Sequence, residues 1–177
     1  GRPAGYNVDL TRAIAQEVGL SIEIRLGPWE EIKNALTLGE IDIIQGMLYS
    51  PERNLVFDFT PPHIVNNYVA VVRKGEGFPP ANADELAGKR IVVQNGDIMQ
   101  EFVIKHGFGD KVVAVESQES ALQKLSKGNF DCALVARMTA LYWIKKQGWN
   151  NLVVGNQSLL SPEYCYAVKK NNKVVLA

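Results

Sequence analysis

Hydrophobic and polar positions follow two periodicities along the first part of the chain, one helical and one alternating. Apolar residues recur at helical spacing in 7–18 and again in 29–38, which predicts two amphipathic helices. Residues 21–26 instead alternate apolar and charged side chains, the pattern of a half-buried strand. Two more apolar runs, at 41–46 and 67–73, predict further strands.

The second part of the chain, after a break rich in Gly and Pro at 75–83, again alternates the two patterns. Strands are predicted at 90–94, 112–115, 130–136, 152–154 and 164–168, and helices at 97–106, 118–127 and 139–147. Such alternation predicts an α/β fold in which mostly parallel sheets are flanked by helices.

A short internal sequence similarity supports two related lobes. Residues 35–44 and 124–133 both read as the end of a helix, a glycine and a strand that carries an aspartate. The glycines, Gly39 and Gly128, suit the left-handed conformation that often ends a helix. The lobes are expected at 1–71 and 72–165, with a return into the first lobe at 166–177. Because α/β units bind ligands outside the carboxyl ends of their strands, two facing lobes would share a cleft.

Charge and cysteine content narrow the class of protein to which the chain can belong. Lys plus Arg and Asp plus Glu number 19 each, so there is no basic excess of the kind that favours a nucleic-acid partner. No apolar run approaches the roughly 18 residues of a membrane span, and residues 1–5 lack the features of a signal peptide. Cys132 and Cys165 are too few for a disulfide framework. They are expected as buried free thiols, with a single bridge as the alternative.

Four segments, in this order, resemble the type II periplasmic solute-binding proteins of the amino-acid-binding branch, family 3. They are P-A-G-Y-N-V-D-L at 3–10, the Trp and Gly-x-x-Asp pattern in 29–44, S-P-E-R with F-D-F-T in 50–60, and L-A-G-K-R at 86–90. The resemblance implies a two-lobed fold that binds a small molecule, without cofactor, outside the cytoplasmic membrane. That fold has a strand before Gly1 and helices after Ala177, so the sequence is expected to be clipped at both ends.

The resemblance also assigns site residues in the first lobe. Arg53 stands where the family's arginine pairs with a ligand carboxylate through its planar fork. The alternatives are a surface arginine in a turn or a pair with Asp58. Gly46 would contact ligand through its backbone, and Trp29 either lines the cleft or belongs to the core. Leu48 occupies a position where the family commonly has Ser or Thr.

The second lobe departs further from the family pattern. Gly96, Asp97 and Ile98 stand where Gly-Thr-Thr usually forms an anion site at a helix N-terminus. Asp97 would cap this helix and add negative charge. Ala136, followed by Arg137, replaces the aspartate that holds a ligand ammonium. We therefore expect a small, anionic, carboxylate-bearing ligand, and weak binding of ordinary α-amino acids.

Residues 95–99 resemble versions of this fold in membrane histidine kinases and diguanylate cyclases. The expected function is thus an extracytoplasmic sensor domain, tethered to the membrane and partnered by a membrane-anchored signalling module. One alternative is a free binding protein of an ABC uptake system, and another is a cyclohexadienyl-dehydratase-like enzyme with Asp97 as general acid. His63 and His106 lack metal-ligand spacing. Phosphate loops and nucleophile elbows are missing, so no catalytic residue, metal or cofactor is expected.

Overall fold

The computed structural model describes residues 3–172, which divide into two compact units. The first unit contains the chain up to Ile64 and from Tyr164 onward, and the second contains Val65–Glu163. The chain therefore crosses between the units twice, after Ile64 and after Glu163. The lobe ranges expected from the sequence are 1–71, 72–165 and 166–177. They describe the parts of the chain that would move as rigid lobes on ligand binding, and they stay a prediction.

The first unit carries two helices that the sequence predicts closely. They are α1 (Tyr6–Glu17) and α2 (Trp29–Leu38). Helix α2 ends at Gly39, whose φ of 81° lies in the left-handed region that glycine adopts without strain. The helical spacing of apolar residues and the glycine stop were therefore sufficient to place this element.

The sheet of the first unit has β9 at its centre. Its strands are β1 (Ile43–Leu48), β2 (Phe57–Phe59), β3 (Ile64–Val65) and β9 (Glu163–Lys169), with a short 3₁₀ turn, η1 (Arg53–Leu55), before β2. Their order is β1-β9-β2, with β3 also paired to β9, and both β1 and β2 run antiparallel to β9. The α/β class is confirmed, but the expected parallel pairing is wrong for these strands. The reason is that β9 returns from the far end of the chain and runs against both neighbours.

Residues 21–26, expected as a strand, form none. Five of the six side chains are exposed, and Ile24 is partly buried. Alternation of apolar and charged residues becomes a strand only where a neighbouring backbone completes the ladder. Within residues 3–172 this segment has no such partner, which explains the error.

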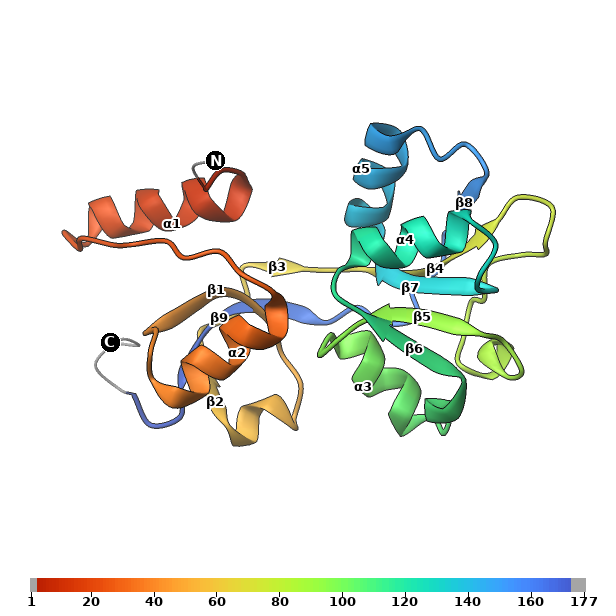
Figure 1. The fold of residues 1–177 in the computed structure, drawn as a ribbon. Coiled ribbons are helices and arrows are strands. Elements are labelled where there is room, and N and C mark those ends of the chain that lie inside the picture. Colours follow the sequence, from red (N-terminus) through yellow and green to blue (C-terminus); the bar gives the residue numbers. More distant parts are fainter. Residues whose placement is uncertain (1–2, 173–177) are drawn as a thin grey trace. The chain divides into compact units, whose positions relative to one another are not determined.

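The second unit is a five-stranded mixed sheet covered on both faces. Its strands are β4 (Tyr68–Arg73), β5 (Ile91–Gln94), β6 (Val112–Val115), β7 (Cys132–Ala136) and β8 (Leu152–Val154), in the order β6-β5-β7-β4-β8. Its helices are α3 (Ile98–Lys105), α4 (Gln118–Ser126) and α5 (Arg137–Gln147), with 3₁₀ turns η2 (Asp84–Leu86) and η3 (Gly109–Lys111). Strand β5 is parallel to β6 and β7, whereas β4 is antiparallel to β7 and β8. Figure 1 shows α3 on one side of this sheet and α4 and α5 on the other.

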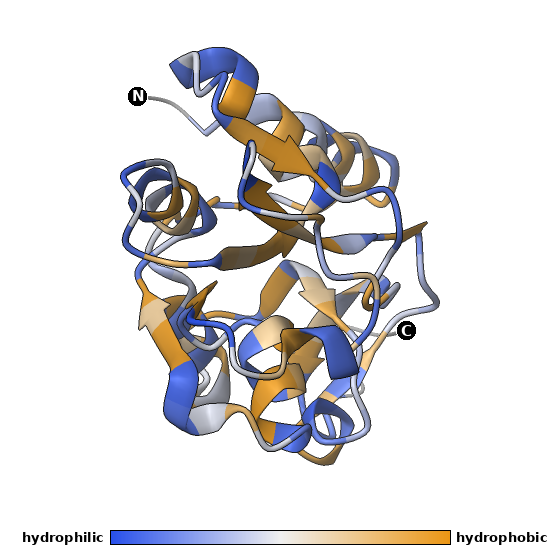
Figure 2. Cartoon of the chain, turned by 90° about the vertical axis from the view of Figure 1, so that its right-hand side faces the viewer, coloured by the Kyte–Doolittle hydropathy of each residue, from blue (hydrophilic) through white to orange (hydrophobic). Residues whose placement is uncertain are grey.

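Apolar residues fill the interior of the second unit. The continuous apolar run of β4 is buried, as expected for a strand covered on both faces. Val71, Val92, Leu122 and Val135 are fully buried members of one core cluster. Figure 2 shows the strands coloured mainly as hydrophobic and the connecting loops mainly as hydrophilic.

Both cysteines are buried thiols that do not form a disulfide with each other, as expected. Burial raises the pKa of the Cys132 thiol to about 12. The thiol therefore stays protonated at neutral pH, and Cys132 serves as a packing residue.

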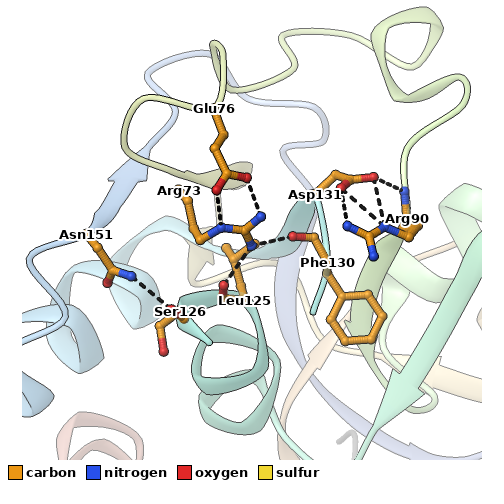
Figure 3. Close-up of polar contacts among 8 residues, drawn as sticks. All are labelled: Arg73, Glu76, Arg90, Leu125, Ser126, Phe130, Asp131 and Asn151. Atoms are coloured by element: carbon orange, nitrogen blue, oxygen red, sulfur yellow. Dashed lines mark hydrogen bonds and ion pairs between the residues drawn. The ribbon is translucent and has the colours of Figure 1, made fainter. Parts of the chain in front are cut away.

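Charged side chains tie together the amino ends of the parallel strands in the second unit (Figure 3). Arg73, at the end of antiparallel β4, donates through Nη1 to the carbonyl oxygens of Leu125 (2.9 Å) and Phe130 (2.5 Å). Beside it, Arg90 Nη2 lies 2.8 Å from Asp131 Oδ1. These contacts fix the connection from α4 to β7. They lie at the amino ends of the parallel strands, away from the carboxyl ends.

Candidate functional site

Arg53 is a buried arginine held by backbone just after β1. Its side chain belongs to a residue only 6% exposed. The amide N donates to Ser50 Oγ (3.1 Å), and Nη1 donates to the Leu48 carbonyl oxygen (3.1 Å). Its Cζ lies 5.7 Å from the centroid of the Trp29 ring. The structure thus brings together three residues singled out in the sequence, and Leu48 contributes its carbonyl group rather than its side chain.

Trp29 belongs to the core, one of the two roles considered for it, and also contacts Arg53. It opens α2 and packs, partly buried, against the core of the first unit, which includes Leu36, Met47 and Phe57. The same ring lies beneath the Arg53 guanidinium, where a cation and an aromatic face attract each other. Because Trp29 is anchored in the core, its ring helps to fix the position of the Arg53 guanidinium.

Gly46 lies in a β-bulge of β1. Register with β9 shifts within 44–47, so that Gln45 and Gly46 together face Tyr166. The ring of Tyr164 covers Gly46 so closely that an added Cβ would be 2.1 Å from the phenolic oxygen. A glycine is required here because Tyr164 occupies the space of a side chain.

A layer of polar groups joins α1 to the same face of β9. Asn7 Nδ2 donates to Tyr164 Oη (3.0 Å). Thr11 Oγ1 donates to Gln45 Oε1 (2.6 Å) and lies 2.8 Å from Tyr166 Oη. Since the single Thr11 hydroxyl proton points to Gln45, Tyr166 is the donor in the second contact. These residues were not predicted as site residues, although the alternation of Tyr164 and Tyr166 in an otherwise apolar strand signals a polar face.

His63 lies against both of these tyrosines. Its ring centroid is 5.4 Å from that of Tyr164 and 5.2 Å from that of Tyr166. Both ring nitrogens are buried, and among residues 3–172 they have no hydrogen-bond partner. Burial lowers the pKa of His63, because the charged imidazolium would lose its hydration there.

In the second unit Asp97 is a buried carboxylate with three donors. The residue is 8% exposed and caps α3, with Oδ1 accepting from Met99 N (2.9 Å). Its Oδ2 accepts from Tyr68 Oη (3.2 Å) and from Gln118 Nε2 (3.2 Å). The predicted capping role is confirmed, and the two additional donors are residues that the sequence did not single out.

Gln118 links Asp97 to the end of β7. Its Oε1 accepts from Ala136 N (3.0 Å), while its Nε2 reaches Asp97 and Tyr68. Two segments singled out in the sequence are therefore connected by one side chain. They lie at the carboxyl ends of β5 and β7, the edge where open α/β sheets bind ligands. A polar residue opening the helix after a parallel strand was the signal that could have identified Gln118.

The other residues predicted for the site in this unit do not share one set of contacts. Gly96, with φ of 68°, donates its N–H to Gln100 Oε1 (2.7 Å). Ile98 is buried. Arg137 is exposed at the start of α5, and its N–H donates to the Asn67 carbonyl oxygen (2.8 Å). The N–H groups of Gly96 and Met99 thus already have acceptors within the protein.

Residues 3–172 lack two features, a metal-binding cluster and a membrane-spanning helix. No cluster of three or more His, Cys, Asp or Glu side chains has the arrangement of a metal site. In the same part of the chain, no helix has the length and apolar character needed to cross a membrane.

Comparison with protein families gives a match over almost the whole sequence. The family described as bacterial extracellular solute-binding proteins, family 3, matches residues 1–175.

Individual relatives are named as amino-acid-binding proteins. The L-cystine-binding protein TcyJ of Escherichia coli K12 is 27% identical over 177 residues, which cover 99% of this chain and 66% of the relative. The ABC transporter arginine-binding protein 1 of the same strain is 25% identical over 178 residues, covering 97% and 71%. The chain therefore spans about two thirds of the length of the cystine-binding relative.

Solved structures confirm the periplasmic-binding-protein fold. A histidine kinase sensor domain, described as similar to periplasmic binding proteins, matches with a TM-score of 0.95 and 37% identity, covering 100% of this chain and 77% of that one. The holo arginine-binding protein of T. maritima matches with a TM-score of 0.88 and 31% identity, covering 99% and 77%.

Proposed function

Because the chain belongs to the bacterial extracellular solute-binding proteins, family 3, we propose that it is an extracytoplasmic sensor domain for a small carboxylate-bearing ligand. On binding, the two lobes close and bias a membrane signalling protein such as a histidine kinase or a cyclase. The two crossings after Ile64 and Glu163 serve as the hinge, since two short connections allow bending without disturbing either core.

The buried Arg53 carries this proposal. A guanidinium fixed by the Leu48 carbonyl and supported by the Trp29 ring is oriented before a ligand arrives. Pre-ordering reduces the entropy lost on binding. A guanidinium also matches a carboxylate with two parallel hydrogen bonds, which makes a carboxylate the natural ligand group.

Comparisons support the sensor role over the transport role. Over the aligned residues the sensor domain is 37% identical to this chain, against 31% for the holo arginine-binding protein of T. maritima and 27% for the cystine-binding protein. The second candidate is a free binding protein that feeds an uptake system, supported by the relatives that are named as cystine-binding and ABC transporter arginine-binding proteins. The enzyme candidate loses support because the oxygens of Asp97 accept from three donors, an arrangement suited to an acceptor rather than a general acid.

The ligand role of Arg53 is tested by calorimetry on ligands found in a thermal-shift screen of simple mono- and dicarboxylates. Arg53→Ala should weaken binding at least about tenfold, equivalent to about 1.4 kcal/mol. Arg53→Lys should also weaken it, because an ammonium cannot pair bidentately. Arg25→Ala, which removes an exposed arginine of the same unit, is the control. Unchanged affinity in a folded Arg53→Ala protein would refute the assignment.

The sensor role is tested on the whole polypeptide. Membrane helices and a cytoplasmic kinase or cyclase in the complete gene, with activity in membrane vesicles that changes on addition of the carboxylate, are the expected results. A lone secretion signal or lipoprotein cysteine would instead identify a free binding protein.

A further inference from the structure

The outward half of α5 exposes large apolar side chains together with lysines. Met138 is 74% exposed, Leu141 43% and Tyr142 56%. Lys145 and Lys146 are exposed one turn further along. Spacings of three, four and seven residues place these side chains on one half of the helix. We call them the α5 outer face.

The opposite half of α5 is already used for packing. Ala140 is fully buried, and Trp143 and Ile144 pack against the core of the second unit. A surface helix of this kind normally presents polar residues to solvent. Because both halves of α5 carry apolar residues, rotation of the helix cannot hide the outer face.

The charge of α5 is entirely positive. Arg137, Lys145 and Lys146 are its charged residues, and it contains no Asp or Glu. Among residues 3–172 neither lysine forms an ion pair. Lys146 Nζ instead lies 5.3 Å from the Tyr142 ring centroid and 4.5 Å from that of Trp143. Lys146 is therefore held beside two aromatic rings, and within residues 3–172 neither lysine has a carboxylate partner.

This combination fits an anionic lipid surface. Tyrosine prefers the level of the headgroups, where its ring and hydroxyl meet different surroundings, and methionine and leucine enter the acyl boundary. Each lysine near an anionic leaflet gains attraction to the lipid phosphates. A convex helix face without acidic residues complements a flat negative surface better than it complements another copy of itself.

We propose that the α5 outer face rests on anionic phospholipid headgroups of the membrane to which the domain is tethered. The proposal relies on the membrane attachment in the proposed function but not on the ligand. A weak contact is sufficient, because a tether keeps the domain at high effective concentration beside the bilayer. The contact would orient the second unit relative to the membrane.

The test measures cosedimentation of the 177-residue chain with vesicles of phosphatidylcholine alone or mixed equally with phosphatidylglycerol. The wild type should bind the mixed vesicles, and added salt should weaken binding. Lys145→Gln with Lys146→Gln should weaken it about thirtyfold, and Leu141→Ser with Tyr142→Ser should also reduce it. Lys111→Gln with Lys127→Gln removes the same charge elsewhere on the second unit and should leave most of the binding.

Three outcomes would overturn the proposal. They are no binding by the wild type, equal binding to neutral vesicles, and equal loss in the control variant. A concentration-dependent dimer that the α5 variants abolish would assign the face to a second copy instead. Carboxylate affinity should stay unchanged in all α5 variants, so failure here is distinguishable from failure of the ligand role of Arg53.

Discussion

The ring of Tyr164 lies against the backbone of Gly46, where a Cβ would be 2.1 Å from the phenolic oxygen and 2.3 Å from the ring carbon that carries it. Gly46→Ala should therefore destabilise the protein by about 1–3 kcal/mol through overpacking, measured by urea unfolding. The cost should persist with Tyr164→Phe, which keeps the ring carbon, and disappear with Tyr164→Ala. An equal cost in all three backgrounds would show that the tyrosine is not the cause.

Zwitterionic α-amino acids should bind weakly or not at all. In the family pattern, position 48 commonly holds a hydroxyl for the ligand carboxylate and position 136 a carboxylate for the ligand ammonium, whereas this chain has Leu48 and Ala136. The measurement is a thermal-shift screen of common amino acids against simple carboxylates. Strong stabilisation by any ordinary amino acid would contradict the expectation.

Charge at Asp97 should oppose an anionic ligand. Asp97→Asn keeps a good N-cap for α3 but removes one negative charge. Affinity for a dicarboxylate should rise about tenfold, as expected for one charge removed at close range in a partly buried site. Asp110→Asn, on an exposed 3₁₀ turn of the same unit, is the matched control. If both variants bind alike, Asp97 acts only as a cap.

His63 should make stability depend on pH. Burial lowers the pKa of His63 from its ordinary 6.5, so the unfolded chain takes up a proton before the folded one does. Its contribution is complete above that pH and is lost as the pH falls through 6.5 toward the folded value. His63→Phe keeps the aromatic contacts and should make the melting temperature less dependent on pH between about pH 5 and 7. His106→Asn, on the exposed end of α3, should retain the wild-type slope.

The pair of Arg90 and Asp131 should contribute to stability except in acid. The hydrogen bond from Arg90 lowers the pKa of Asp131 below its usual 3.8. The contribution is therefore complete above the unfolded value and is lost as the pH falls through the folded one. Because the Asp131 side chain is 35% exposed, Asp131→Asn should cost only about 1 kcal/mol at neutral pH. Urea unfolding should show a smaller difference from wild type below about pH 3.

The sequence by itself determined the elements whose signals are local. Helix α2 begins at Trp29 and ends before Gly39, as predicted, because apolar spacing and a left-handed glycine act within a few residues. The capping role of Asp97 was likewise readable from its position. The ordered family motifs pointed to the fold, which the solved structures confirm.

Only the tertiary structure decided which polar residues meet. Tyr68 and Gln118 reach Asp97 across 29 and 21 residues, because the order β5-β7-β4 brings their strand and helix ends to one edge. Tyr164 reaches Gly46 because β9 returns antiparallel beside β1. Residues 21–26 failed as a strand for the same reason, since a local pattern cannot supply the neighbouring backbone. Pairing between distant segments depends on the packing of the whole unit, which no local rhythm of hydrophobic residues encodes.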